Sequence, residues 1–223
     1  IPDGTMKFMS KKFQTIKWKH KSIHPTGSAC SGEKHPSKSY IISIGLPLLM
    51  DILLTGAYGR VGTAIIDHLA DQTAYEFTYL DRSDQPAYET FIADISNYDD
   101  IRPAFEGKDA VIHLAGYPET DGTWEQILEN NLIGMYNTLE ATKAAEVPKF
   151  IFASTNHVVG MYEIEHAPEI YNPKFGLVID HHSPIRPDSL YGASKAFNEA
   201  IGRYFVENFQ QPSQFYALRL GSV

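Results

Sequence analysis

A glycine-rich turn between a buried strand and an amphipathic helix constrains the fold of this chain more than any other feature. Residues 52–55 predict the strand, and the apolar spacing of residues 61–69 predicts the helix. The turn has the spacing G-x-x-G-x-x-G, set by Gly56, Gly59 and Gly62. Glycines let a pyrophosphate approach the backbone, and the helix N-terminus offers N–H groups to an anion. The stretch therefore favours a dinucleotide-binding loop over a turn whose glycines are only structural.

An acidic residue ends the next predicted strand, residues 77–81. Asp81 lies 19 residues after Gly62, the position from which a carboxylate can bind the hydroxyls of an adenosine ribose. A carboxylate there also repels a 2′-phosphate, so NAD is favoured over NADP, although the adjacent Arg82 weakens that preference. The alternative is that Asp81 only caps a turn.

Strands and helices go on alternating to the end of the chain. Further strands are predicted at 91–95, 109–116, 149–154 and 214–220, and helices near 98, at 124–146 and at 188–210. This alternation predicts an α/β fold, a Rossmann-type doubly wound parallel sheet. Residues 161–188 have little periodicity and predict a long excursion, a kind of segment that is often functional.

The ends of the third and fourth predicted strands offer further candidate contacts. Asp94 follows the third strand, where it can meet an adenine edge or cap the helix that starts near Tyr98. Ala115 and Gly116 end the fourth strand and leave bare backbone along which a cofactor can pass. His113, inside that strand, is interpreted as a core residue.

The densest polar cluster follows the fifth predicted strand. Residues 154–157 bring hydroxyl, amide and imidazole groups to the carboxyl end of a parallel strand, where sites form. In the last helix, Tyr191 and Lys195 are four residues apart and share one face. A neighbouring ammonium favours the phenolate and lowers the pKa of tyrosine from about 10. The pair therefore predicts a proton donor and acceptor, although Tyr-x-x-x-Lys alone is also an ordinary helical pair.

Taken in order, these motifs resemble those of the extended short-chain dehydrogenase/reductase family over residues 50–223. The resemblance implies a catalytic triad of Thr155, Tyr191 and Lys195, with Asn131 supporting a proton relay. It implies that the following residues border NAD: Gly56, Tyr58, Gly59, Arg60, Val61, Gly62, Asp81, Asp94, Ile95, Leu114, Ala115, Gly116 and Lys195.

Three stretches, residues 152–157, 186–195 and 218–222, are similar to uronate dehydrogenases and related sugar dehydrogenases. The sequence Ser-Thr-Asn-His and the long insert after it also resemble NAD-dependent glucose-6-phosphate dehydrogenases of salt-adapted archaea. This resemblance implies oxidation of a uronate, aldose or hexose phosphate at C1 to a lactone, with Asn156 and His157 contacting substrate hydroxyls. The alternatives are an NAD-dependent nucleotide-sugar epimerase or dehydratase, and a non-catalytic NAD-binding scaffold.

The resemblance and the composition together limit which classes of partner we expect. Family members pair through two long helices, which implies a homodimer or higher homo-oligomer here. Residues 50–223 carry 11 basic and 25 acidic side chains, a balance that does not suit nucleic acid. Cys30 is the only cysteine, so no disulfide framework exists and a cytoplasmic location is expected. The longest apolar run, residues 41–50, is too short to cross a bilayer, so no membrane partner is expected.

Residues 1–49 differ from the rest of the chain. They carry eight lysines and two acids, and residues 1–40 show neither helical nor strand periodicity. We expect the native protein to begin at Met50, with the preceding residues a non-native extension; the alternative is a disordered basic arm that touches a membrane or nucleic acid. Their histidines and cysteine have the spacing of no standard metal site, and no metal is expected. Residues 50–223 are expected to be the NAD-binding domain, incomplete at the C-terminus because the chain stops at a strand end.

Overall fold

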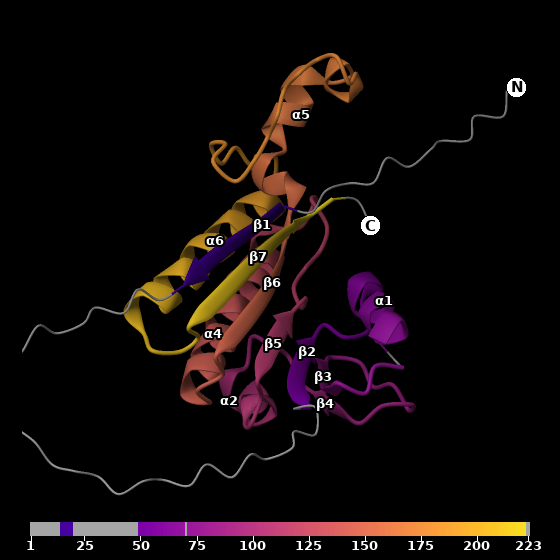
Figure 1. Ribbon diagram of the computed structural model, residues 1–223, viewed down its shortest axis with the longest axis vertical. Coiled ribbons are helices and arrows are strands. Elements are labelled where there is room, and N and C mark those ends of the chain that lie inside the picture. Colours follow the sequence, from indigo (N-terminus) through magenta and orange to yellow (C-terminus); the bar gives the residue numbers. More distant parts are fainter. Residues whose placement is uncertain (1–13, 20–48, 70, 222–223) are drawn as a thin grey trace, which may run out of the picture.

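In the part of the chain that the structure describes, a mixed seven-stranded sheet organises the fold (Figure 1). The structure is a computed structural model that describes residues 14–19, 49–69 and 71–221. The strand order is β1-β7-β6-β5-β2-β3-β4. The strands are β1 (Gln14–Lys19), β2 (Met50–Thr55), β3 (Tyr75–Asp81), β4 (Thr90–Ile92), β5 (Ala110–His113), β6 (Lys149–Thr155) and β7 (Gln214–Leu220). Strands β2 to β7 are mutually parallel, and β1 pairs antiparallel with β7 at the edge.

Helices connect the parallel strands as the alternation of the sequence predicts. The α-helices are α1 (Arg60–Leu69), α2 (Tyr98–Ile101), α3 (Trp124–Ile127), α4 (Gly134–Ala144), α5 (Met161–His166) and α6 (Leu190–Asn208). Short 3₁₀ segments are η1 (Arg102–Phe105), η3 (Asn156–Val159) and η4 (Glu169–Tyr171), and η2 (Leu128–Ile133) is a π-helix between α3 and α4. The doubly wound α/β prediction is confirmed.

The sheet separates two apolar clusters because successive side chains of a strand point to opposite faces. Leu53 lies in the larger cluster, which the phenylalanines of β6, β7 and α6 dominate. Its neighbour Leu54 lies in the smaller cluster with Ile66 of α1. The loops that leave the carboxyl ends of the parallel strands therefore start from a rigid, well-packed edge.

Differences from the predicted elements that exceed two residues occur at β4, at β5 and in the long helix before β6. Strand β4 ends at Ile92, so Asp94 and Ile95 lie in the turn after it. Strand β5 ends at His113, before the expected limit at Gly116. The expected helix over 124–146 is interrupted by the π segment η2, and the chain turns at Glu146, which has a positive φ of 57°.

The structure does not test the prediction that residues 1–49 are a non-native or disordered extension. Residues 1–13 and 20–48, on which most of that prediction falls, lie outside the described residues. Gln14–Lys19 do form a strand, for which the sequence showed no period, with Trp18 paired in register with Phe215. Whether residues 1–49 are native stays a prediction.

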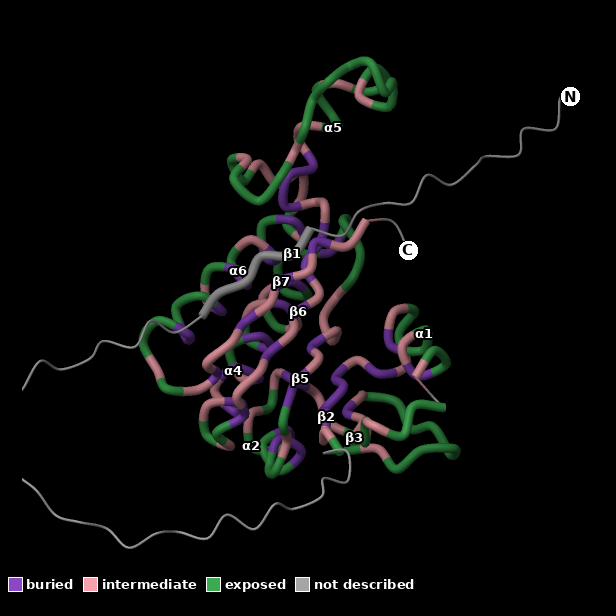
Figure 2. The backbone as a smooth tube through the Cα atoms, viewed as in Figure 1, coloured by how far each residue is buried: buried purple, intermediate pink, exposed green. Residues whose placement is uncertain are grey.

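Residues 161–188 form the excursion that the sequence indicates. Figure 1 shows the segment that contains α5 projecting beyond the body of the sheet. Figure 2 shows that most of this segment is exposed. Across the described residues, no helix has both the length and the apolar composition that crossing a bilayer requires.

Candidate active site

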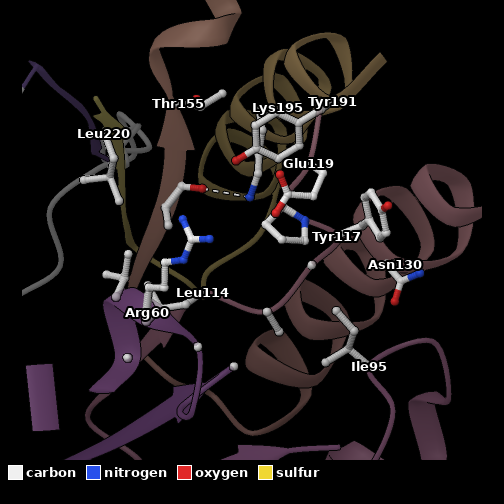
Figure 3. Close-up of a pocket in the computed structure, with 18 of the residues that line it drawn as sticks. Arg60, Ile95, Leu114, Tyr117, Glu119, Asn130, Thr155, Tyr191, Lys195 and Leu220 are labelled. Atoms are coloured by element: carbon white, nitrogen blue, oxygen red, sulfur yellow. Dashed lines mark hydrogen bonds between the residues drawn. The ribbon is translucent and has the colours of Figure 1, made fainter. Parts of the chain in front are cut away.

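A cavity of about 640 Å³ opens at the carboxyl edge of the parallel strands (Figure 3). Its floor is the glycine turn after β2, and its walls come from the ends of β3, β5, β6 and β7 and from α6. In doubly wound sheets this edge is where ligands bind. Twelve of the thirteen residues predicted to border a cofactor line the cavity, and Asp94 does not.

Two glycines of the turn are required by close contacts. Gly56 has a φ of +67°, and a Cβ there would lie 2.6 Å from the backbone nitrogen of Ala115. A Cβ on Gly62 would overlap the carbonyl oxygen of Ala57. Gly59 has ordinary space around it, so its value lies in the bare backbone that it leaves at the start of α1. The open cradle at a helix N-terminus fits a pyrophosphate.

The Asp81 carboxylate sits at one end of the cavity. One of its oxygens accepts from the backbone N–H of Tyr58 at 3.2 Å, and the other accepts from the N–H of Ser83 at 3.0 Å. These bonds hold the carboxylate beside the glycine turn, where the ribose of a dinucleotide would lie. The side chain of Tyr58 stacks on Tyr88, away from this role, so Tyr58 contributes backbone to the site.

Two predicted site residues do not line the cavity. Asp94 accepts from the N–H of Ser96 at 2.9 Å and lies 3.7 Å from the Arg82 guanidinium, so its carboxylate stabilises the turn before α2.

The other residue is Asn131, whose amide oxygen accepts from the N–H of Tyr117 at 2.6 Å. Its nitrogen donates to the carbonyl of Tyr117 and to Ser194 Oγ at 3.0 Å, so the side chain ties η2 to α6.

The three residues of the predicted triad meet at the other end of the cavity. Thr155 ends β6, and Tyr191 and Lys195 project from α6, whose first turn is capped by Ser189 Oγ accepting from the N–H of Gly192. The ammonium of Lys195 is buried and donates to the carbonyl of Ala153 at 2.9 Å (Figure 3, dashed line). It lies 5.6 Å from the centre of the Tyr191 ring.

Burial shifts both titratable members of the triad away from their charged forms. The pKa of Lys195 falls to about 8 because the ammonium is desolvated. The pKa of Tyr191 is raised by desolvation, lowered by a hydrogen bond with Thr155 and raised by the nearby charge of Glu119. Desolvation of the phenol is the largest of these effects, so the net pKa of Tyr191 is raised, and a lowering of that pKa by Lys195 stays a prediction.

His113 is a core residue, as predicted. It is 1% exposed, and its Nδ1 lies 2.8 Å from Thr55 Oγ1. Burial, with the nearby charge of Lys195, lowers the pKa of His113 to about 3, so the ring is neutral at physiological pH. It packs between the strands below the site and takes no part in the cavity lining.

Asn156 and His157, predicted to contact substrate, both line the cavity. Thr155 Oγ1 donates to Asn156 Oδ1 at 3.3 Å and accepts from the N–H of His157 at 3.2 Å, so one hydroxyl organises this turn. The His157 ring lies edge-on to Tyr191, with ring centres 5.9 Å apart. The side chains therefore surround the space in front of the tyrosine.

Several lining residues were not among those predicted. Tyr117, Pro118 and Glu119 follow β5 and place an exposed carboxylate near Tyr191. The only sequence signal for them is that they continue a strand end already assigned to the cofactor. The others are Leu80, Arg82, Ser83, Ala93, Asn130, Ala153, Leu220 and Gly221, whereas Ser154 belongs to the polar cluster that the sequence indicated.

Residues 52–223 match the NAD dependent epimerase/dehydratase family. The chain belongs to this family. It is 42% identical to the NAD-dependent glucose-6-phosphate dehydrogenase of Haloferax volcanii, over 70% of this chain and 63% of the relative. It is 39% identical to the L-arabinose 1-dehydrogenase (NAD(P)(+)) of the same organism, over 70% of this chain and 61% of the relative.

A solved family structure, a variant of uronate dehydrogenase from Agrobacterium tumefaciens in complex with NAD, has the same fold. The two share 29% identity with a TM-score of 0.62, covering 73% of this chain and 58% of the other. The chain thus spans about 60% of the length of the curated relatives it matches. The resemblance to sugar dehydrogenases of the short-chain dehydrogenase/reductase type is confirmed.

Proposed function

We propose that this protein is an NAD-dependent dehydrogenase that oxidises a sugar, whether a uronate, an aldose or a hexose phosphate, at C1 to the lactone. The observation that carries the proposal is the meeting of Thr155, Tyr191 and Lys195 at one end of a cavity whose other end is the glycine turn. Curated relatives that act on glucose 6-phosphate and on L-arabinose support the substrate class.

The chain's residues would manage the proton of the reaction. Tyr191 takes the proton of the C1 hydroxyl, and Thr155 holds the same oxygen as it becomes a carbonyl. Lys195 supplies positive charge beside the phenolate and offers an N–H to the cofactor. Asn131 fixes η2 against α6 beneath them and supports a proton relay. NAD, when bound, supplies the acceptor for the hydride that leaves C1.

NAD is proposed as the preferred cofactor on the strength of Asp81. Two backbone N–H groups hold this carboxylate at the ribose end of the cavity, where it would repel a 2′-phosphate. Arg82, which would favour a phosphate, lies near Asp94 and Asn130. The glycine turn and Arg60, which points into the cavity in Figure 3, would hold the pyrophosphate.

A homodimer or higher homo-oligomer in the cytoplasm is proposed as the working form. The helical face built by α4 and α6 exposes Tyr136, Phe197 and Tyr204, three large rings that a partner helix pair could cover. The chain's single cysteine, Cys30, supports a reducing compartment.

The test is NADH formation by the full-length protein offered galacturonate, glucuronate, glucose 6-phosphate or L-arabinose with NAD. We expect turnover with at least one sugar, and a loss of about 10²-fold or more in kcat for Tyr191→Phe. Tyr75→Phe, an exposed tyrosine at the amino end of β3 and outside the cavity lining, is the matched control and should keep full activity. Bound NAD with no NADH formed from any sugar would contradict the proposal and favour an epimerase or dehydratase.

A further inference from the structure

A histidine–aspartate pair stands beside the tyrosine of the site. His157 Nδ1 lies 2.7 Å from Asp188 Oδ2, and the side chains are 35% and 14% exposed. His157 comes from η3, after β6, and Asp188 precedes α6, so the fold brings them together across 31 residues. Asp188 itself does not line the cavity, whereas His157 does.

The backbone around the pair is fitted to this contact. Gly160 has no room for a Cβ because the Asp188 carboxylate occupies that space, and Gly192 has none because the carbonyl of His157 is there. The N–H of Arg186 donates to the carbonyl of Val158 at 3.0 Å, which fastens the end of the excursion to η3.

The second oxygen of the carboxylate is also held. Ser189 Oγ donates to Asp188 Oδ1 at 2.8 Å, and the same hydroxyl accepts from the N–H of Gly192 at the start of α6. The carboxylate is thus fixed by the helix cap with its other oxygen toward the imidazole. The geometry of the pair therefore follows from the same turn that places Tyr191.

A carboxylate accepts hydrogen bonds, so its contact with Nδ1 places the proton of a neutral imidazole on Nδ1. Nε2 then carries a lone pair. Within the described part of the chain, no side chain bonds Nε2 of His157. The ring stands edge-on to Tyr191, with centres 5.9 Å apart. A hydrogen-bond acceptor therefore lies beside the proton-accepting phenol.

We propose that Asp188 is a positioning residue that holds His157 as the Nδ1–H tautomer, so that Nε2 accepts a hydrogen bond from the sugar hydroxyl next to C1. This proposal rests on the proposed function and adds a substrate requirement to it. Neighbouring hydroxyls of one sugar ring reach two adjoining side chains, so Tyr191 takes the C1 hydroxyl and His157 the C2 hydroxyl. A sugar that lacks the second hydroxyl leaves the acceptor unpaired and is discriminated against.

The experiment compares a sugar with its 2-deoxy counterpart. The full-length protein and Asp188→Asn are assayed with whichever of galacturonate, glucuronate, glucose 6-phosphate and L-arabinose is a substrate, and with the 2-deoxy form of that sugar. An asparagine keeps the shape of Asp188, but its amide can donate to Nδ1 and favour the opposite tautomer. We expect kcat/KM for the hydroxylated sugar to fall about 10- to 100-fold, the worth of one such bond. For the 2-deoxy sugar it should fall less than about threefold.

Two further variants keep the result interpretable. Asp180→Asn, an exposed aspartate of the excursion, should leave both sugars unaffected. In a His157→Phe background, Asp188→Asn should cost nothing more, because its effect passes through the imidazole. Equal losses for both sugars, no loss for either, or a second loss in that background would overturn the assignment while leaving sugar oxidation intact. A wild-type protein that oxidises no sugar would instead refute the proposed function.

Discussion

The burial of Lys195 lowers the stability of the folded protein. The residue is 4% exposed, and desolvation of its ammonium lowers its pKa from 10.5 to about 8. That difference corresponds to about 3 kcal/mol of unfolding free energy. Below pH 8 the lysine is charged in both the folded and unfolded states, and the cost is fully present. Between pH 8 and 10.5 the folded state releases its proton first, so the cost shrinks as the pH rises.

Replacing Lys195 should therefore stabilise the protein while removing its activity. We expect Lys195→Met to raise the free energy of unfolding by about 2 kcal/mol at pH 7, allowing about 1 kcal/mol for the lost bond to the Ala153 carbonyl. Urea denaturation at pH 7 and at pH 10.5 measures this, and the gain should shrink at the higher pH. Lys174→Met, at an exposed position, should change stability little at either pH. A variant less stable than the wild type at pH 7 would show that burying the Lys195 ammonium does not lower the free energy of unfolding.

At the scale of elements, α6 is fastened to the sheet by a buried ionic network. Arg219 of β7 donates through Nε and Nη2 to both carboxylate oxygens of Glu199 at 2.8 and 2.7 Å. Ser154 Oγ, in β6, donates to the same carboxylate at 2.6 Å. Glu199 lies one turn after Lys195 on α6, so this network fixes the helix that carries the site against the strand that ends in Thr155.

Breaking that network should be expensive, since it leaves a buried guanidinium without its charged partner. We expect Glu199→Gln to lower the free energy of unfolding by about 3–5 kcal/mol. The exposed Arg203–Glu207 pair of the same helix provides the control, and Glu207→Gln should cost less than about 1 kcal/mol. Chemical denaturation of both variants measures the two losses in unfolding free energy. Comparable losses would mean that burial adds nothing to the Glu199 contact.

The sequence predicts features that depend on local patterns, but not contacts between residues far apart in the chain. Strand β7 and the ends of β2, β3 and β6 follow from local apolar patterns. The glycine turn, Asp81 and Thr155 could be predicted as candidate site residues because they lie at those strand ends, and Tyr191 because it shares one face of a predicted helix with Lys195. Pairings across long separations could not be found in the same way. The Asn131 amide bonds Ser194, 63 residues away, and this contact gives Asn131 a structural task that its sequence position does not reveal. The raised pKa of Tyr191 likewise depends on burial, which no four-residue spacing encodes.

For the whole molecule, the fold aligns two half-sites along one sheet edge. The turn after β2 and the end of β3 form the half that would hold a dinucleotide, and β6 with α6 forms the half that would act on a sugar. The strand order places β5 between them, so the bare backbone of Ala115 and Gly116 bridges the halves. Under the proposed function, a reaction between the two ligands would require the sugar to present C1 toward the cofactor.

The most direct measurement uses a substrate sugar carrying deuterium at C1. The full-length protein is incubated with NAD and the labelled sugar, and the NADH and sugar products are analysed by mass spectrometry. We predict one deuterium in each NADH formed and a lactone that has lost it. Unlabelled NADH, or a rearranged sugar with no net NADH, would contradict oxidation at C1.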